Sequence, residues 1–298
     1  MNNKMLLFII VILSIVALLS SQKETTFFNN DISIKVKDDE EDEISDILLE
    51  EYVIGVVAGE MPASFNEEAL KAQAIAARSF AVNKINSSKK DYDVLKDKRS
   101  QVYITEAEMK DKWKDSFSKY YEKIKKAVMD TKGQVMKYND EVISAYYFAM
   151  SNGMTEDVSL VFGNSKEYLK SVNSEWDKNI KNFEVTKVFS KEKFKKLLGI
   201  KDKEIIIGEI EYSKTNRVNS ITVNNKKYKG TEFRKLLNLR STDFDIVNGP
   251  EITITTRGYG HGVGMSQYGA NEMAKKGYKY DDILKYYYQD IVIEQIIV

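Results

Sequence analysis

Residues 51–78 read EYVIGVVAGEMPASFNEEALKAQAIAAR, and this stretch predicts the helical centre of the fold. Its apolar residues indicate one helix over Leu48–Met61, which Pro62 ends. A capping-box pattern (S-x-x-E) at Ser64 predicts the start of a second helix, which runs to about Ile85. Because apolar residues occupy nearly all faces of both helices, we expect the pair to be largely buried.

Glu60 is the carboxylate at the bend between the two helices. Its neighbours along the chain include Val57, Met61 and Phe65. Burial among such side chains raises the pKa of a carboxyl, which suits a general acid near neutral pH. The alternative is a partly exposed glutamate at a helix end, without a role in chemistry.

Arg78 lies among Ala74, Ile75 and Ala77 in the second helix. A buried guanidinium requires a carboxylate or an anionic ligand. Arg78 is therefore either a substrate-binding residue or half of a structural ion pair, with Glu60 as a candidate partner. A close arginine would lower the pKa of Glu60 and oppose its use as an acid. The two roles are compatible if Arg78 mainly binds substrate, or if Glu60 alternates between acid and base.

The composition excludes several classes of protein. The chain has 298 residues with 45 basic and 45 acidic side chains, and this balance gives no indication of a nucleic-acid partner. At 43% hydrophobic residues it can form a sizeable core. Cysteine is absent and His261 is the single histidine, which excludes a disulfide scaffold and a metal site with several His or Cys ligands. We expect neither a metal nor another cofactor.

The N-terminus carries an uncharged apolar run over Met5–Leu19. The run is short for a membrane span, which usually takes about 20 residues, and no small-x-small cleavage pattern follows it. We therefore expect residues 1–20 to be an uncleaved membrane anchor rather than a signal peptide, with the body of the protein exported. Residues 21–46 are polar and contain an acidic run at 38–43, which predicts a solvated acidic linker.

The remaining pattern predicts an α+β fold. A main catalytic domain would comprise residues 47–177 and 240–298, and a smaller inserted α+β subdomain would comprise residues 178–239. In the main domain we expect a Lys-rich amphipathic helix over Glu106–Thr131 and strands over Val135–Met150, with a turn at Asn139 and Asp140.

The predicted insertion is Lys-rich and reads as strands with one short helix. FEVTKVF and EIIIGEIEY predict strands, TEFRKLLNL predicts the helix, and SITVNNKKYKG predicts a hairpin that turns at Asn224 and Asn225. We expect the main domain to resume with the strand EITITT (residues 251–256), a glycine-rich turn and two terminal helices.

The glycine-rich turn reads RGYGHGVGMSQYGA over residues 257–270. Its alternating glycines do not fit the G-x-G-x-x-G dinucleotide pattern, and the chain contains no Walker loop and no G-x-S-x-G elbow. Glycines at this density allow the backbone to approach a ligand or a packed neighbour closely. His261, at the centre of the turn, is either a hydrogen-bonded structural histidine or a donor or proton carrier that lines a cleft.

A second polar turn, SNG at residues 151–153, follows the predicted strand SAYYFAM. Small polar residues at the end of a strand either line a pocket or form a plain turn. Aromatic residues near these turns, such as Tyr103 and Tyr259, are able to bind sugar rings, although most aromatics serve the core.

Several segments resemble the stage II sporulation protein D family. The strongest are YVIGVVAGEMPASFNEEALKAQAIAARSFA, QVY at residues 101–103, YYFAMSNGMTEDVSLVFG, EYLKSVNSEWD, EFRKLLNLRSTDF and RGYGHGVGMSQYGA. Together they cover most of residues 47–298, and an N-terminal membrane anchor is typical of that family. The resemblance implies a peptidoglycan lytic transglycosylase, which cleaves peptide-stripped glycan strands to 1,6-anhydro products while the developing spore is engulfed.

The resemblance also implies roles for particular residues. Glu60 matches the family's catalytic acid, Arg78 its important arginine, and Lys170 a further functional basic residue. Arg78 and Lys170 would hold the lactyl carboxylate of the sugar or neighbouring polar groups. Other residues of these motifs are expected to bind substrate around the cleft: Gln101, Tyr103, Ser151, Arg240, Ser241, His261 and Gln267.

The implied partners are the glycan strands of peptidoglycan, a cell-wall amidase that strips the stem peptides, and a membrane scaffold protein of the engulfment complex. The implied location is membrane-anchored, with an extracytoplasmic body. A lytic transglycosylase needs only one carboxylate, because the 6-hydroxyl of the muramic acid itself attacks the anomeric carbon, whereas most glycosidases use two. Glu60 would protonate the glycosidic oxygen and then take the proton of that hydroxyl.

Two departures from the family pattern stand out. Some relatives carry Cys and His just before the Gln-x-Tyr motif and bind zinc there, whereas this chain has Leu95, Arg99 and Ser100, so we expect no zinc at that site. SNG also differs from the common Ser-Gly-Gly, which leaves its role open. Two other functions remain open: a non-catalytic, glycan-binding amidase enhancer and a purely structural envelope protein.

Overall fold

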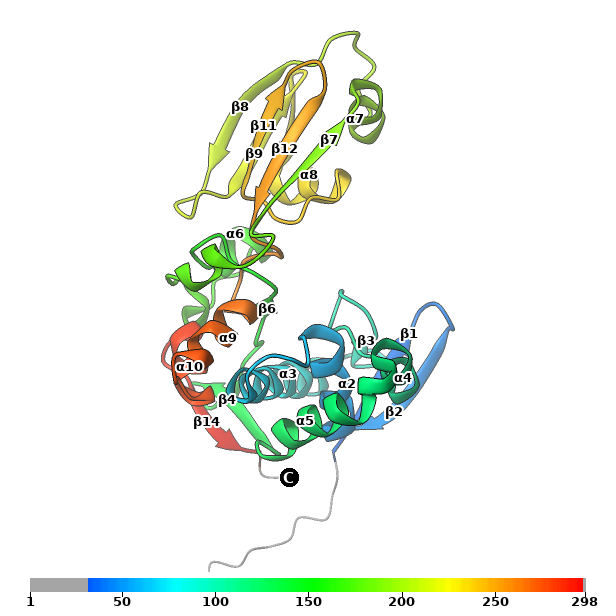
Figure 1. The fold of residues 1–298 in the computed structure, drawn as a ribbon, viewed down its shortest axis with the longest axis vertical. Coiled ribbons are helices and arrows are strands. Elements are labelled where there is room, and N and C mark those ends of the chain that lie inside the picture. The colour runs from blue at the N-terminus through cyan, green and yellow to red at the C-terminus, as the bar shows by residue number, and fades with distance from the viewer. Residues whose placement is uncertain (1–31, 297–298) are drawn as a thin grey trace, which may run out of the picture. The chain divides into compact units, whose positions relative to one another are not determined.

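A computed structural model describes residues 32–296 of the chain. The anchor predicted at residues 1–20 lies outside these residues. No helix within residues 32–296 is both long and apolar enough to cross a membrane. The fold is α+β, as the sequence predicted, with helices, hairpins and small sheets (Figure 1).

The centre of the fold is a set of three helices that contact one another: α2 (Leu49–Glu60), α3 (Glu67–Ser87) and α5 (Phe117–Met129). Most residues of α2 and α3 are buried. This confirms the two apolar helices that the sequence predicted on either side of Pro62. Their lack of a polar face follows from their position, because neighbouring elements cover them on several sides.

The start of α3 differs from the prediction. The capping box was expected at Ser64, but the N-cap is Asn66, whose side-chain oxygen accepts a hydrogen bond from the Glu68 N–H at 2.9 Å. Asn and Ser are comparably good N-cap residues, so the S-x-x-E pattern alone did not decide between them.

The Lys-rich helix predicted over Glu106–Thr131 is two helices rather than one. The first, α4 (Glu106–Trp113), ends at Lys114, which has a φ of 46°. A short 3-10 turn, η1 (Lys114–Ser116), then leads into α5. Positive φ is rare outside glycine, and the apolar period of a helix carries no signal for it.

The segment predicted as an acidic linker forms a β-hairpin in its described part. β1 (Ser33–Asp38) pairs with β2 (Glu43–Leu48) and, in parallel, with β3 (Val94–Leu95). Ile34 and Val36 are buried and alternate with polar residues. The acidic run lies at the turn, where some of its side chains pair with basic residues. The linker prediction is therefore wrong for residues 33–46, because a two-residue apolar period outweighed the polar composition.

Two small sheets form the next part of the fold. One has the order β14-β4-β5 (Val292–Gln295, Gln134–Tyr138, Glu141–Val142), and the other pairs β6 (Tyr147–Phe148) with β13 (Met265–Ser266) in parallel. The predicted turn is confirmed, since Asn139 and Asp140 have φ of 50° and 64°. The short terminal strand β14 was not predicted.

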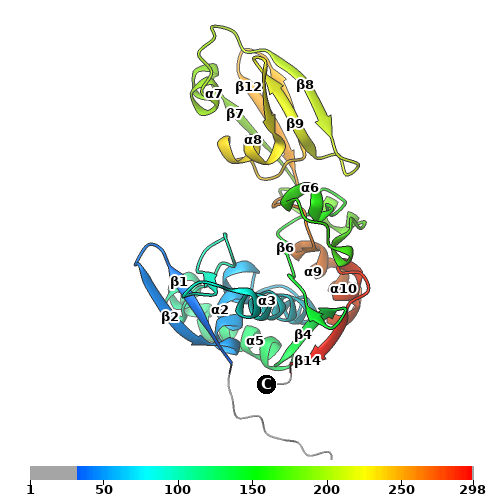
Figure 2. The ribbon, with the colours of Figure 1, turned by 180° about the vertical axis from the view of Figure 1, so that it is seen from behind.

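The two predicted terminal helices are present as α9 (Gln267–Lys275) and α10 (Tyr280–Tyr287), and both contact α3 (Figure 2). Between β6 and the insertion the chain forms short helical turns. These are α6 (Val158–Phe162), η2 (Glu167–Leu169) and η3 (Glu175–Asn179).

The predicted insertion contains two three-stranded sheets. Their orders are β10-β9-β8 (Lys226–Lys229, Val218–Val223, Ile207–Tyr212) and β11-β12-β7 (Phe244–Asn248, Ile252–Arg257, Glu184–Phe189). With α7 (Lys191–Leu198) and α8 (Gly230–Leu236) they enclose a core around Phe194 and Phe233. The predicted hairpin is confirmed, with Asn224 and Asn225 at φ of 47° and 62°.

The strand EITITT was expected in the main domain, but as β12 it lies in the sheet of the insertion. It pairs with β7, and its residues Ile252 and Ile254 belong to the same core as Phe194. The inserted part therefore extends to about Arg257 rather than ending at residue 239. Strand pairing across so much of the chain leaves no local pattern in the sequence.

Candidate active site

Glu60 is the last residue of α2, where its carboxyl meets the chain at Val102. The Val102 N–H donates to Oε1 at 2.7 Å. Oε2 accepts no hydrogen bond from residues 32–296 and is not among the buried unpaired atoms, so it reaches solvent. Burial raises the pKa of Glu60 above its ordinary 4.5, while the Val102 hydrogen bond and the charge of Lys112 oppose the rise. This carboxyl has a raised pKa and one free oxygen, as a general acid requires.

Two glycines of α2 bring the Gln-x-Tyr motif against the helix. A Cβ on Gly55 would lie 2.3 Å from Cε2 of Tyr103, and one on Gly59 would lie 2.2 Å from the carbonyl oxygen of Val102. No side-chain carbon fits at such distances, so glycine is required at both positions, one turn apart on the same helix face. The motif therefore lies directly on the helix that carries Glu60.

A chain of hydrogen-bonded side chains lies beside Glu60. The Tyr52 hydroxyl donates to Gln101 Oε1 at 3.1 Å, and Gln101 Nε2 donates to the Tyr147 hydroxyl at 2.9 Å. Tyr103 stacks on Tyr52 with ring centroids 5.4 Å apart. Burial, with the charge of Glu60, raises the pKa of both Tyr52 and Tyr147, which keeps their hydroxyls protonated. The structure thus brings Gln101 and Tyr103 together with Glu60 and adds Tyr52 and Tyr147, which the sequence analysis missed.

The glycine-rich turn packs against residues 146–151. Its four alternating glycines all have positive φ: Gly258 (73°), Gly260 (119°), Gly262 (90°) and Gly264 (77°). A Cβ on Gly264 would lie 1.9 Å from the carbonyl oxygen of Tyr146. Met265 pairs with Tyr147 in the β6–β13 ladder. The glycines therefore allow close packing of two backbone segments, and Tyr147 links the turn to the cluster around Glu60.

His261 is half-buried, and its Nδ1 accepts a hydrogen bond from the Val263 N–H at 3.0 Å. Burial and, to a smaller extent, the nearby charges of Arg234 and Arg217 lower the pKa of His261 to about 3. The imidazole is therefore neutral at physiological pH. Of the two roles left open by the sequence, this arrangement favours the hydrogen-bonded structural histidine over the proton carrier.

Gln267 is the first residue of α9, and its Nε2 donates to Gln73 Oε1 at 3.4 Å. Gln73 is fully buried in α3, and its own Nε2 has no partner among the described residues. Unpaired buried amides are rare because each one costs free energy. Sequence analysis missed Gln73, although a glutamine within an Ala-rich apolar helix was a visible signal.

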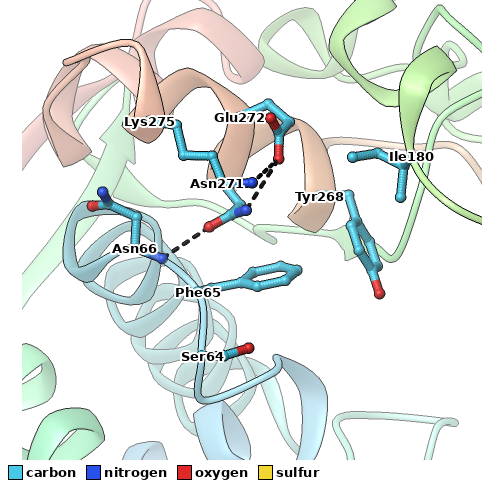
Figure 3. Close-up of a pocket in the computed structure, with 8 residues that line it drawn as sticks. All are labelled: Ser64, Phe65, Asn66, Ile180, Tyr268, Asn271, Glu272 and Lys275. Carbon is cyan, nitrogen blue, oxygen red and sulfur yellow. Dashed lines mark hydrogen bonds and ion pairs between the residues drawn. The ribbon is translucent and has the colours of Figure 1, made fainter.

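A pocket of about 370 Å³ lies between the start of α3 and α9 (Figure 3). Its lining residues are Ser64, Phe65, Asn66, Ile180, Tyr268, Asn271, Glu272 and Lys275. The rings of Phe65 and Tyr268 meet edge to face with centroids 5.0 Å apart, and the Asn66 N–H donates to Asn271 Oδ1 at 2.8 Å. Aromatic rings beside amide and charged groups suit a sugar ring, and the pocket begins shortly after Glu60 in the chain.

Arg78 forms a buried ion pair with Glu50, not with Glu60. Its Nε and Nη2 donate to the two carboxylate oxygens at 2.9 and 2.6 Å, and Nη1 donates to the carbonyl oxygen of Gln134 at 3.1 Å. The side chain has no exposed surface. A helix rises about 1.5 Å per residue, so Glu50 and Glu60 lie roughly 15 Å apart at opposite ends of α2. Arg78 therefore has the structural role that the sequence left open, and the expected conflict with the pKa of Glu60 does not arise. A substrate-binding role remains only a prediction.

Lys170 is part of a different cluster. Its ammonium pairs with Glu167 at 3.3 Å and Asp157 at 3.8 Å, and it remains about 40% exposed. None of its contacts involves Glu60 or the Gln-x-Tyr motif, so the structure does not bring Lys170 together with the candidate acid. Its substrate-binding role also remains a prediction.

Ser151 is buried and belongs to a cage around Asp177. The carboxylate of Asp177 accepts hydrogen bonds from Ser151 and Ser174 at 2.7 and 2.8 Å on Oδ2, and from Ser266 at 2.8 Å on Oδ1. Burial raises the pKa of Asp177 to about 6, although the serine hydroxyls oppose the rise. The sequence analysis missed this group. The cage joins three separate motifs, which indicates a structural role for Ser151.

Arg240 and Ser241 hold the start of the glycine-rich turn. The Arg240 guanidinium lies 4.7 Å from the ring centroid of Tyr259, and its Nη1 donates to the carbonyl oxygen of Asn182 at 2.6 Å. Ser241 is buried, and its hydroxyl is 2.6 Å from the carbonyl oxygen of Arg257. Both residues therefore lie at the predicted turn, apart from the cluster around Glu60.

Among residues 32–296, no three His, Cys, Asp or Glu side chains gather so as to hold a metal ion. The residues that stand at the zinc position of some relatives make other contacts. The Ser100 hydroxyl accepts a hydrogen bond from the Leu95 N–H at 3.0 Å, and Arg99 pairs with Asp39 and Asp97.

Comparisons with known proteins agree with the resemblance. The family described as Stage II sporulation protein matches residues 37–138. Stage II sporulation protein D of Bacillus subtilis (strain 168) is 44% identical over 272 residues, which is 89% of this chain and 79% of that protein. The protein of the same name from Bacillus amyloliquefaciens is 41% identical over the same shares.

A more distant relative is the amidase enhancer of Bacillus subtilis (strain 168), which is 29% identical over 78% of this chain and 39% of that protein. The matched segment of the family includes both Glu60 and the Gln-x-Tyr motif beside it. Together, the extent of the match and the identity to the two Bacillus proteins show that this chain belongs to the stage II sporulation protein D family.

Proposed function

We propose that this protein is a lytic transglycosylase that cuts peptide-stripped glycan strands of the cell wall during sporulation. The observation that carries the proposal is the state of Glu60. Its carboxyl is mostly desolvated, its pKa is raised, and one of its oxygens is bonded to a backbone N–H while the other reaches solvent. This is the condition in which a carboxyl can give a proton and then accept one.

In the proposed reaction, protonated Glu60 gives its proton to the glycosidic oxygen that follows a muramic acid residue. The bond between that oxygen and the anomeric carbon breaks, and the 6-hydroxyl of the same muramic acid bonds to the anomeric carbon. The Glu60 carboxylate takes the hydroxyl proton, which restores the acid. The products are a free 4-hydroxyl and a 1,6-anhydro sugar, and no water is consumed. An intramolecular nucleophile in good alignment contributes about 7–11 kcal/mol to such a step.

The surroundings of Glu60 support this role. No basic side chain of the described part of the chain forms an ion pair with Glu60, which would hold it ionised. Tyr52, Gln101 and Tyr147 supply polar groups beside it, and Tyr103 supplies an aromatic ring. The pocket between α3 and α9 has the size and lining for a neighbouring sugar ring.

The test is digestion of peptide-stripped glycan strands with the wild-type protein and Glu60→Gln, followed by mass spectrometry. Gln keeps the shape and the hydrogen bond from Val102 but cannot transfer a proton. We expect 1,6-anhydro products from the wild-type protein and almost none from Glu60→Gln. Undiminished anhydro product from the variant would show that Glu60 is not the acid, and hydrolysed ends in place of anhydro ends would exclude a transglycosylase.

A second candidate function is a glycan-binding protein that assists an amidase without cutting the strand. The observation in its favour is the relative named amidase enhancer, which matches 78% of this chain. Such a protein would bind strands through the same groups around Glu60 and the same pocket between α3 and α9. Tight binding of strands by the wild-type protein, with no soluble fragments released, would favour this function over the transglycosylase.

A further inference from the structure

The six arginines of the chain fall into two groups. Arg78, Arg99 and Arg257 each form ion pairs with carboxylates. The other three, Arg217, Arg234 and Arg240, form no ion pair with any carboxylate of residues 32–296. These three come from separate positions of the chain and gather around the glycine-rich turn at Tyr259–Gly262.

Arg217 offers an unoccupied donor edge. It is 4% exposed, and its Nη1 donates to the carbonyl oxygen of Met154 at 3.1 Å. Nε is buried without a partner, and Nη2 has no partner but reaches solvent. Nε and Nη2 form the edge of a guanidinium that binds both oxygens of a carboxylate. Arg78 uses the same edge for Glu50, whereas in Arg217 it is empty.

Arg234 is the second unpaired guanidinium. Its Nε donates to the carbonyl oxygen of Leu239 at 3.3 Å, and its two terminal nitrogens reach solvent without a protein partner among the described residues. Leu239 precedes Arg240, whose carbonyl oxygen accepts a hydrogen bond from the Gly260 N–H at 3.0 Å, so Arg234 lies beside the glycine-rich turn that also contacts Arg217. Its charge acts on both Arg217 and His261. Burial lowers the pKa of Arg234 and Arg217, which reflects the free-energy cost of desolvating two like charges together.

The carboxylates nearest to Arg217 are already engaged elsewhere. Glu156 accepts hydrogen bonds from the hydroxyls of Ser213 and Thr215. Asp243 accepts hydrogen bonds from Asn152 at 2.7 Å and from Arg257 at 2.9 Å. Both act on Arg217 only through their charge. The empty edge is therefore not the result of a missing acidic partner nearby, because the acids face other groups.

The glycine-rich turn packs against this guanidinium, while the Nη2 end of the edge still reaches solvent. A Cβ on Gly262 would lie 2.8 Å from Nε, Cζ and Nη2 of Arg217 alike, so the turn can approach the guanidinium this closely only because residue 262 is glycine. His261 is neutral and adds no competing positive charge. The Arg240 guanidinium stacks on Tyr259 at the other end of the turn. The result is a small positive site with a backbone wall.

We propose that Arg217 and Arg234, beside Gly262, form a carboxylate-binding subsite that recognises the lactyl carboxylate of muramic acid in a glycan strand. The inference rests on the proposed function. It explains why a protein that cuts glycan at Glu60 would select strands without stem peptides. Where a stem peptide is attached, the lactyl group is an amide and carries no charge. Only a stripped muramic acid therefore presents the anion that these arginines lack.

The subsite is connected to Glu60 through one residue. Met265 of the glycine-rich segment pairs with Tyr147 in the β6–β13 ladder, and the Tyr147 hydroxyl lies at Gln101 and within the field of Glu60. A strand that extends past Glu60 would thus meet the two arginines with a muramic acid away from the cleavage point. Arg78 and Lys170, which the sequence favoured for this carboxylate, are already paired with acids.

The test measures strand binding by fluorescence anisotropy, in a Glu60→Gln background so that nothing is cut. The probes are labelled peptide-stripped strands and the same strands after conversion of their carboxylates to methylamides. We expect the methylamide strands to bind about tenfold more weakly or worse, since a charged hydrogen-bonded pair is lost. Adding Arg217→Gln or Arg234→Gln should weaken binding of the stripped strands to the level of the methylamide strands.

Arg99→Gln is the matched control, because Arg99 is an arginine with acidic partners of its own and should keep the full preference for charged strands. Strands that retain their stem peptides carry carboxylates on the peptide but none on the lactyl group. Equal binding of stripped and methylamide strands would overturn the proposal, and so would tight binding of peptide-bearing strands through the same arginines. If Arg217→Gln does not fold, the probe comparison and Arg234→Gln still decide. Loss of the transglycosylase proposal would leave these affinity ratios unchanged.

Discussion

Two carboxyls of this protein, the half-buried Glu60 and the buried Asp177, share a raised pKa but differ in what surrounds them. Asp177 has no exposed surface and accepts three serine hydroxyls from three motifs. Glu60 accepts one backbone N–H and keeps one oxygen open to solvent. The comparison teaches that a raised pKa alone does not mark a catalytic acid. Access to a proton acceptor from outside the protein is also required.

The largest expected effect is on activity, and it should come from a change at Glu60 rather than at Asp177. We expect Glu60→Gln to lower the rate of anhydro-product formation by about 10²–10⁴-fold, because general acid catalysis of that size is lost. Its unfolding midpoint in urea should stay close to that of the wild-type protein. A variant that loses activity only as far as it loses stability would contradict the assignment of Glu60 as the acid.

Asp177→Ala should show the opposite pattern. Three serine hydroxyls would lose their acceptor and a small cavity would form, so we expect a loss of about 3–4 kcal/mol in the free energy of unfolding. The measurement is urea unfolding at pH 7 followed by circular dichroism. The folded fraction of the variant should retain its activity per molecule. Full stability in Asp177→Ala would mean that the serine cage does not hold the three motifs together.

The pH dependence of stability offers a finer test of the cage. With a folded pKa of about 6 against an ordinary 3.8, the folded protein holds the Asp177 proton more tightly than the unfolded chain does. The contribution of this group therefore falls as pH rises from 4 to 6, by about 3 kcal/mol in total. Asp177→Asn lacks this change. Urea unfolding at pH 4 and pH 7 should show the wild-type protein losing that much more stability than Asp177→Asn, and identical pH dependences would disprove the raised pKa.

The smallest expected effect concerns Lys112, whose charge lowers the pKa of Glu60. Its ammonium donates to the carbonyl oxygen of Ala58 at 2.8 Å and makes no ion pair with the carboxyl. Because the reaction begins with protonated Glu60, activity should fall at high pH along a limb set by that pKa. Lys112→Gln should move this limb to higher pH by less than about one unit. A limb that moves to lower pH would show that Lys112 does not act on Glu60 through its charge.

Local features of the sequence predicted much of the fold. The apolar runs on either side of Pro62 became α2 and α3, and the Asn-Asn and Asn-Asp pairs became turns with positive φ. The alternating glycines also behaved as expected, since each has a positive φ in a close backbone contact or turn. These features depend on neighbouring residues alone, because backbone sterics and apolar periodicity act over one or two turns of chain.

Two predictions were wrong because they relied on composition. In one case apolar periodicity determined the structure, and in the other the pairing of distant strands did. The acidic segment was predicted to be a linker. It forms a hairpin that pairs with β3, because Ile34 and Val36 are buried in the core. The strand at residues 252–257 looked like part of the main domain, but it pairs with β7. The apolar period of β1 was visible in the sequence, whereas the partner of β12 lies far away along the chain and left no local pattern.

The sequence by itself determined the helical hairpin, the apolar setting of Glu60 and the glycine-rich turn. Only the tertiary structure decided which charges are satisfied. Arg78 is paired with Glu50, Asp177 accepts hydrogen bonds from three serines, and the Nε of Arg217 has no partner among the described residues. The physical reason is that burial and hydrogen bonding of a charge depend on which distant segments meet around it. The local chain sets only the place where the charge enters the fold.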